Sequence, residues 1–156
     1  MTIKDIFLNG LIGKGAHVNI KDAFDDLPWE FTAVQPEGCP FSIWQLLKHM
    51  IYWQKYNIAQ LENEQVSAPV HASLSWTETI GPSSQSEWLI TRSEFFADLD
   101  FIIRKVDIGF DEGNIMSQDI KILGSITGHN SYHLGQIVMI RRIVGSWPPP
   151  SGGDTW

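Results

Sequence analysis

The apolar residues of this chain recur at intervals of three and four over four long segments, and no segment alternates convincingly in the way that a strand requires. A helix with that spacing has one apolar face, which becomes stable when it packs against another element. The sequence therefore predicts an all-α four-helix bundle. We expect its helices near residues 2–27, 42–64, 84–106 and 117–144, with the third beginning at Ser84 or at Ser86.

Glycines and a capping pattern place the ends of the first two helices. Gly10, Gly13 and Gly15 weaken the middle of the first segment, so we expect either one helix or two pieces joined by a bend. Ser42 is followed three residues later by Gln45, a spacing at which the two side chains cap the first turn of a helix. The second helix is therefore expected to start at Ser42.

Two stretches are expected to lie outside the helices of a single domain that covers residues 1–156. Residues 65–84 contain two prolines and little periodicity, which predicts a long crossover between the second and third helices. Residues 147–156 begin with the letters WPPP, a run that cannot be helical. They predict an extended tail whose terminal Trp156 docks on the body or on a second subunit.

Composition and charge exclude several classes of protein. A formal charge of −7 argues against a nucleic-acid partner, because binding to phosphates needs clustered lysine and arginine. The tight basic pair at 141–142 is expected to complement the dipole of the last helix. No apolar run approaches the roughly 20 residues of a membrane-spanning helix, and no secretory pattern opens the chain, so we expect a cytoplasmic protein. Cys39 is the only cysteine, which excludes an internal disulfide and cysteine-based zinc sites.

Three histidines in two of the helical segments form a candidate metal site. His129 and His133 are four residues apart, so both imidazoles leave the same face of a helix, one turn apart. Such a pair either binds one cation or is buried with neighbouring side chains as hydrogen-bond partners. His49 lies in the apolar run of the second segment, and three imidazoles buried together without a metal are costly. We therefore predict that His49, His129 and His133 bind one divalent metal where the two helices pack together.

The chemistry of the ligands restricts the metal and its surroundings. Three nitrogens and open positions for water suit zinc, nickel, cobalt, iron(II) or manganese, with zinc or nickel favoured by affinity. Gln136, one turn beyond His133, is a candidate partner of that histidine, a substrate contact or a surface amide. Trp53, one turn beyond His49, is either a pocket wall or a core residue. His17 is either a further ligand or a surface histidine.

These residues resemble a known family. The second segment contains LKHM at residues 47–50, and the fourth contains HNSYHLGQ at residues 129–136. Both stretches are similar to the DinB-like superfamily of metal-binding four-helix bundles. The RR pair at 141–142 and WPPP at 147–150 resemble the way in which many members end. The likeness covers essentially the whole chain in the order of its elements.

The resemblance implies a site, a cofactor and an assembly. It implies that His49, His129 and His133 hold one divalent metal, that the substrate is a small molecule and that the chain is a homodimer. Characterised members include transferases and isomerases that use low-molecular-weight thiols such as mycothiol or bacillithiol. Many members have arginine after the last ligand histidine, where this chain has Leu134.

Two functions remain open on the sequence. In the first, the chain is a metal-dependent enzyme, a thiol-dependent transferase or a hydrolase, in which the ion activates a bound thiol or water as nucleophile. The resemblance favours thiol transfer. In the second, the chain is a non-catalytic, metal-stabilised bundle that binds a ligand or partner, and a closed ligand sphere would favour it.

Overall fold

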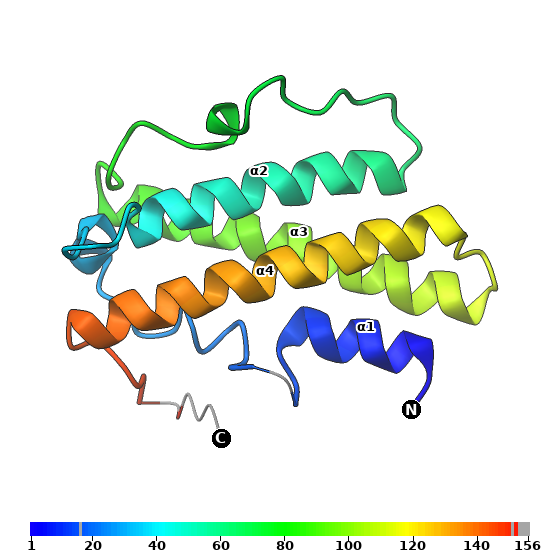
Figure 1. Cartoon of the computed structure of the whole chain (residues 1–156). Helices are drawn as coiled ribbons and strands as arrows, with labels where there is room; N and C mark the ends of the chain where they lie inside the picture. The colour runs from blue at the N-terminus through cyan, green and yellow to red at the C-terminus, as the bar shows by residue number, and fades with distance from the viewer. Residues whose placement is uncertain (16, 151, 153–156) are drawn as a thin grey trace.

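The fold is an all-α four-helix bundle, as the sequence predicts (Figure 1). The structure, a computed structural model, describes residues 1–15, 17–150 and 152. Within these residues there is no strand. The helices are α1 (Ile3–Ile12), α2 (Ile43–Leu61), α3 (Gln85–Asp111) and α4 (Ser117–Ile143), with two short 3-10 helices, η1 (Trp29–Ala33) and η2 (Ala72–Ser75).

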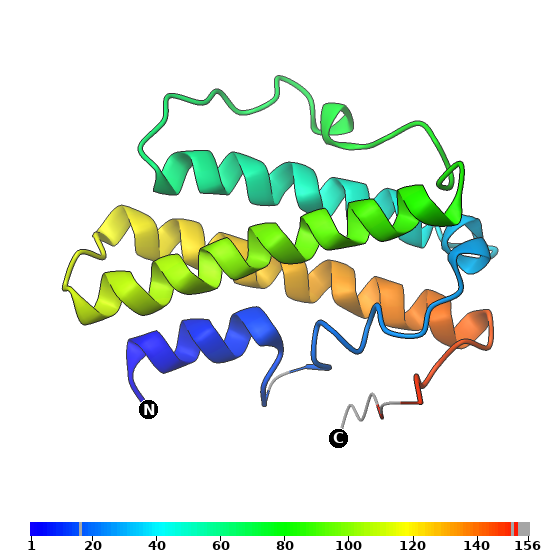
Figure 2. The same cartoon turned by 180° about the vertical axis from the view of Figure 1, so that it is seen from behind.

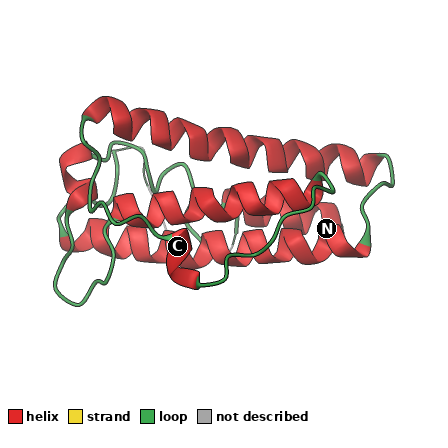
Figure 3. Ribbon diagram, turned by 90° about the horizontal axis from the view of Figure 1, so that it is seen from above, coloured by secondary structure: helices red, strands yellow, loops and turns green. Residues whose placement is uncertain are grey.

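The long crossover sets the direction of the helices. It runs back along the length of α2, so α2 and α3 point the same way while α4 points the opposite way (Figures 1 and 2). Seen from above, the crossover follows the bundle axis and carries η2 partway along it (Figure 3). Helix α2 packs against α3 and α4, and α1 packs against the same two helices. The face between α2 and α4 is therefore a helix–helix interface with a loop passing beside it.

The predicted start of α2 is confirmed, and its capping explains why it begins where it does. The Ser42 hydroxyl accepts a hydrogen bond from the backbone N–H of Gln45 at 3.2 Å, and the Gln45 side chain accepts from the backbone N–H of Ser42 at 3.1 Å. Helices α2 and α4 end within three residues of their expected ends. Helix α3 continues to Asp111, beyond the expected end at Val106.

The first helix is shorter than expected, because Gly13 ends it. Gly13 has a φ of +84°, and a side chain at this position would overlap the carbonyl oxygen of Val18. The described residues between Gly13 and η1 are irregular, so a helix over residues 2–27 is wrong beyond Ile12. The apolar residues of this irregular segment are nevertheless buried in the core: Val18, Ile20, Ala23, Phe24 and Leu27. Their spacing indicated burial and not helical conformation.

Arg141 holds this irregular segment against the end of α4. Its side chain is 0% exposed, and Nη1 donates to the carbonyl oxygens of Asp22 and Ala23, both at 3.0 Å. Nε and Nη2 donate to the carbonyl oxygen of Ser146 at 3.1 and 2.7 Å. The guanidinium also lies 5.2 Å from the ring centroid of Trp147. Arg141 lies in the last turn of α4, as expected, and in addition joins three parts of the chain.

The C-terminal tail is not helical over residues 147–150, as WPPP requires. Trp156, which we expected to dock, lies outside the described residues. None of the helices in the described part of the chain is long and apolar enough to cross a membrane.

Candidate metal centre

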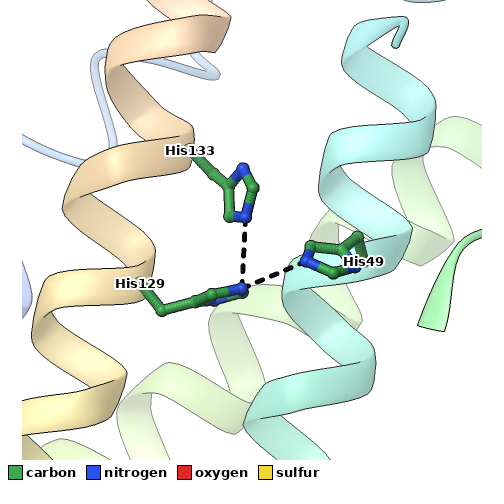
Figure 4. Close-up of side chains that lie close together, drawn as sticks. All are labelled: His49, His129 and His133. Carbon is green, nitrogen blue, oxygen red and sulfur yellow. Dashed lines mark hydrogen bonds between the residues drawn. The ribbon is translucent and has the colours of Figure 1, made fainter. Parts of the chain in front are cut away.

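The structure brings His49, His129 and His133 together between α2 and α4 (Figure 4). The Nε2 atom of His129 lies 3.1 Å from Nε2 of His49 and 3.1 Å from Nε2 of His133. One ligand atom from each histidine lies within 4.8 Å of the other two. His49 and His133 are buried, and His129 is partly buried. The three imidazoles therefore form one cluster that can hold a metal ion.

The helical repeat and the packing of α2 against α4 explain this convergence. His129 and His133 lie one turn apart on the face of α4 that meets α2. His49 lies between the buried residues Leu46 and Met50 on the opposing face of α2. The antiparallel arrangement of the two helices places the single histidine beside the pair. Each helix thus contributes ligands from its interior turns, where the backbone is held rigidly.

Hydrogen bonds to Ser75 determine which nitrogen of His49 carries the proton. His49 Nδ1 lies 3.0 Å from the hydroxyl oxygen of Ser75 and 3.3 Å from its carbonyl oxygen. The hydroxyl proton is already donated to the carbonyl oxygen of Ala72 at 2.7 Å. Both oxygens of Ser75 therefore accept, and Nδ1 of His49 donates. In the neutral ring this leaves a lone pair on Nε2, which faces His129.

Gln136 determines which nitrogen of His133 carries the proton. Its Oε1 accepts a hydrogen bond from Nδ1 of His133 at 2.7 Å, which leaves a lone pair on Nε2 of that ring. A proton on Nε2 of His129 can pair with only one of the two lone pairs that face it. A single cation between the three rings satisfies all three nitrogens at once. The donor set thus fits a metal better than it fits a purely hydrogen-bonded core.

Burial keeps the cluster in the neutral form that binds metals. Burial lowers the pKa of His49 to about 4, helped by the charge on His133 and opposed by the hydrogen bond that the ring donates to the Ser75 carbonyl oxygen. Burial lowers the pKa of His129 to about 4 as well, with the charges on His133 and His49 as smaller causes. Burial also lowers the pKa of His133, against the hydrogen bond to Gln136. Near pH 7 His49 and His129 are neutral, so no proton competes with a cation for their nitrogens.

Aromatic rings enclose the cluster. The indole of Trp76 stacks on His49 with ring centroids 3.8 Å apart, and the ring of Phe41 stacks on Trp76 at 3.6 Å. Trp53 lies in edge-to-face geometry with His49 and with His129, at centroid distances of 6.4 and 6.3 Å. Trp53 was expected as a pocket wall or a core residue, and it lies against two of the three imidazoles. Aromatic rings thus lie against the cluster from α2 and from the crossover.

Other residues singled out in the sequence lie elsewhere. His17 is not part of the cluster, and its Nδ1 is hydrogen-bonded to the carbonyl oxygen of Val18 at 2.8 Å. Across the part of the chain that the structure describes, no carboxylate, thiol or fourth imidazole joins the three histidines. A tetrahedral ion held by them would keep one position open.

Sequence reasoning missed Ser75 and Trp76, which both contact His49 from the crossover. Neither residue belongs to a periodic pattern or to a ligand motif. The only signal was the length of the crossover, since long loops in compact domains are often functional.

A cavity of about 370 Å³ lies beside the cluster, between α4 and the loop that precedes α2. Gln136 lines it and also holds His133, so one residue contacts both the cavity and the metal centre. Most of the other lining side chains are apolar: Pro40, Phe41, Leu46, Met139 and Ile140.

Comparisons with known proteins return no match, whether with family models, with curated proteins or with solved structures.

Proposed function

We propose that this chain binds one divalent transition metal through His49, His129 and His133 and uses it as an enzyme of the DinB-like thiol-transferase type. The observation that carries the proposal is the convergence of three Nε2 atoms, two of which have their lone pairs directed by hydrogen bonds on the far side of the ring. The separations of 3.1 Å from Nε2 of His129 to Nε2 of His49 and of His133 are close to the roughly 3.3 Å between two nitrogens of a tetrahedral zinc site.

The absence of a fourth ligand among the described residues supports a catalytic ion over a structural one. Structural zinc sites have four protein ligands, whereas catalytic sites have three and an exchangeable position. A divalent ion in such a site lowers the pKa of a coordinated thiol or water towards neutrality. A low-molecular-weight thiol such as bacillithiol is the nucleophile that the family resemblance implies, with zinc or nickel as the metal.

The chain itself contributes orientation and exclusion of water. Ser75 and Gln136 fix the rings of His49 and His133, and Trp76 shields the face of His49. Gln136 uses its amide oxygen for His133, so its amide nitrogen is available to donate a hydrogen bond to a small molecule in the adjacent cavity. The apolar lining of that cavity favours a substrate with an apolar portion.

Elemental analysis of the purified, untagged protein tests the metal site. The wild type is expected to hold about one equivalent of zinc or nickel, and His49→Ala is expected to lose it. His71→Ala is the matched control, because His71 is an exposed histidine of the crossover. If the wild type binds neither metal even after addition of zinc or nickel, the proposal is wrong and the histidines are core residues.

Thermal unfolding of His133→Ala separates the two functions that the sequence left open. Loss of the metal with a fold that stays intact indicates a functional ion, and thiol transfer and hydrolysis are then assayed with small electrophilic substrates. Unfolding on loss of the metal indicates a metal-stabilised binding protein. The homodimer that the family resemblance implies is tested separately by sedimentation equilibrium.

A further inference from the structure

A second, larger cavity of about 510 Å³ opens at the other end of the bundle. It lies between the C-terminal ends of α2 and α3 and the N-terminal end of α4. Among the α4 residues that line this cavity, Leu123 is the nearest in sequence to His129. The rise of 1.5 Å per residue places the two residues about 9 Å apart along the helix axis. The cavity is thus separate from the metal centre and shares none of its residues.

The floor of this cavity is apolar and part of its rim is apolar too. Leu61, Val106 and Leu123 form a floor that is 3%, 0% and 1% exposed. At the rim, Ile108 and Met116 leave 53% and 68% of their surface exposed. Large apolar side chains exposed around an apolar floor are typical of a binding site. The volume lies in the range of cavities that take small molecules, roughly 300 to 1,000 Å³.

Of the two cationic side chains that line the cavity, one has no ion-pair partner among the described residues. Each carboxylate that lines it already has a partner. The pairs are Glu62 with Lys105 at 2.6 Å, Glu112 with Asn114 at 2.9 Å, and Asp119 with the backbone N–H of Met116 at 2.9 Å. Arg104 also lines the cavity and makes no hydrogen bond or ion pair with any residue that the structure describes. Its guanidinium is therefore free to form the paired hydrogen bonds that a carboxylate accepts.

We propose that this cavity binds a small monocarboxylate with an apolar body. The carboxylate pairs with Arg104, and the body lies over the accessible apolar side chains of Ile108, Ile115 and Met116, above the buried floor. A ligand with two acidic groups fits less well, because Lys105 is already paired with Glu62. This proposal does not depend on a metal at the histidine cluster.

Titration of the full chain with matched ligands tests the proposal. The probes are 4-phenylbutyrate, the neutral 4-phenylbutanamide and decanoate. Calorimetry measures the affinity of each probe, and the methyl NMR signals of Ile115 report where it binds. Both carboxylates are expected to bind the wild type and to shift Ile115, which lines the cavity. Arg104→Gln is expected to weaken both carboxylates at least tenfold and to leave the affinity for the amide unchanged.

Two further variants guard against loss of fold and against a general effect of charge. Lys121→Gln removes one positive charge from an exposed position of α4 outside the cavity, and it is expected to bind the carboxylates as the wild type does. Ile108→Glu places a negative charge at the exposed rim and is expected to weaken the carboxylates as Arg104→Gln does. Equal carboxylate affinity in wild type and Arg104→Gln, shifts at Ile140 instead of Ile115, or no binding of either carboxylate to the wild type would overturn the proposal.

Discussion

The indole ring of Trp76 lies nearly parallel to the imidazole of His49, with ring centroids 3.8 Å and planes 9° apart. The preceding residue, Ser75, accepts hydrogen bonds from Nδ1 of the same ring. Both residues belong to the connection between α2 and α3, 26 residues after His49 in the case of Ser75. Helix α2 thus places His49 in the core, and the crossover orients its ring.

Replacement of Trp76 by alanine is expected to lower the affinity for zinc or nickel about tenfold. The variant loses the ring that shields His49 from water and limits its rotation, and residues that orient a ligand typically contribute ten- to a hundredfold in affinity. Competition with a chromophoric chelator measures the change. Trp76→Phe keeps an aromatic ring at the position and is expected to retain most of the affinity. Equal affinities for wild type and Trp76→Ala would show that the stacking has no role in binding.

Gln136→Leu is expected to weaken metal binding by ten- to a hundredfold. The leucine cannot accept the hydrogen bond from Nδ1 of His133, so the ring is free to rotate or to move its proton to Nε2. Gln136→Glu keeps an acceptor and adds a negative charge, and it is expected to bind the metal at least as tightly as the wild type. Calorimetric titration of the three proteins checks this order, and a glutamate variant as weak as the leucine variant would contradict it.

The metal-free protein is expected to lose stability as the pH falls from about 6.5 to about 4. Burial lowers the pKa of His49 and His129 from 6.5 to about 4 in the folded state, so within this window the unfolded chain binds more protons. The two neutral rings make their full contribution to the free energy of unfolding above pH 6.5, and this contribution is lost as the pH falls towards 4. Each ring adds at most about 1.4 kcal/mol per pH unit.

Urea unfolding of the metal-free protein at several pH values measures this slope. The double variant His49→Gln, His129→Gln lacks both groups and is expected to give a shallower dependence between pH 6.5 and 4. Identical slopes for the wild type and the double variant would show that other groups control the acid sensitivity.

Arg141→Met is expected to destabilise the fold by about 3 kcal/mol or more. The methionine fills much of the space but leaves the carbonyl oxygens of Asp22, Ala23 and Ser146 without their donor, at roughly 1 to 3 kcal/mol for each group that stays buried. Arg142→Met, in the same turn at an exposed position, is the control and is expected to cost much less. Comparable losses in both variants, measured by thermal unfolding, would contradict the role given to Arg141.

The helices and the histidine cluster were predictable because both follow from the helical repeat. The pair His129 and His133 shares a face of any helix, and the apolar neighbours of His49 direct that residue to the same core. A bundle of four helices leaves few other ways to bury these faces. The convergence itself still needed the structure, because the sequence does not determine how far α2 slides along α4.

The rest was not predictable, because it depends on contacts between distant segments. The apolar spacing from Val18 to Leu27 is compatible with a helix, but Gly13 ends the helix and Arg141 binds carbonyl groups that a helix would have used. Ser75 and Trp76 follow no periodic pattern, and only the path of the crossover brings them to His49. Local patterns report burial well, whereas loop conformation depends on the partners that it meets.

The docking of the crossover on His49 also has a thermodynamic consequence. Ser75 and Trp76 contact the ring of His49, so docking of the crossover and binding of a cation are coupled. If the docked crossover strengthens cation binding, a bound cation must stabilise the docked crossover by the same free energy. The order of the crossover then increases with the fraction of protein that holds a cation. The accessibility of the backbone around η2 to a protease would report how full the centre is, without any assay of turnover.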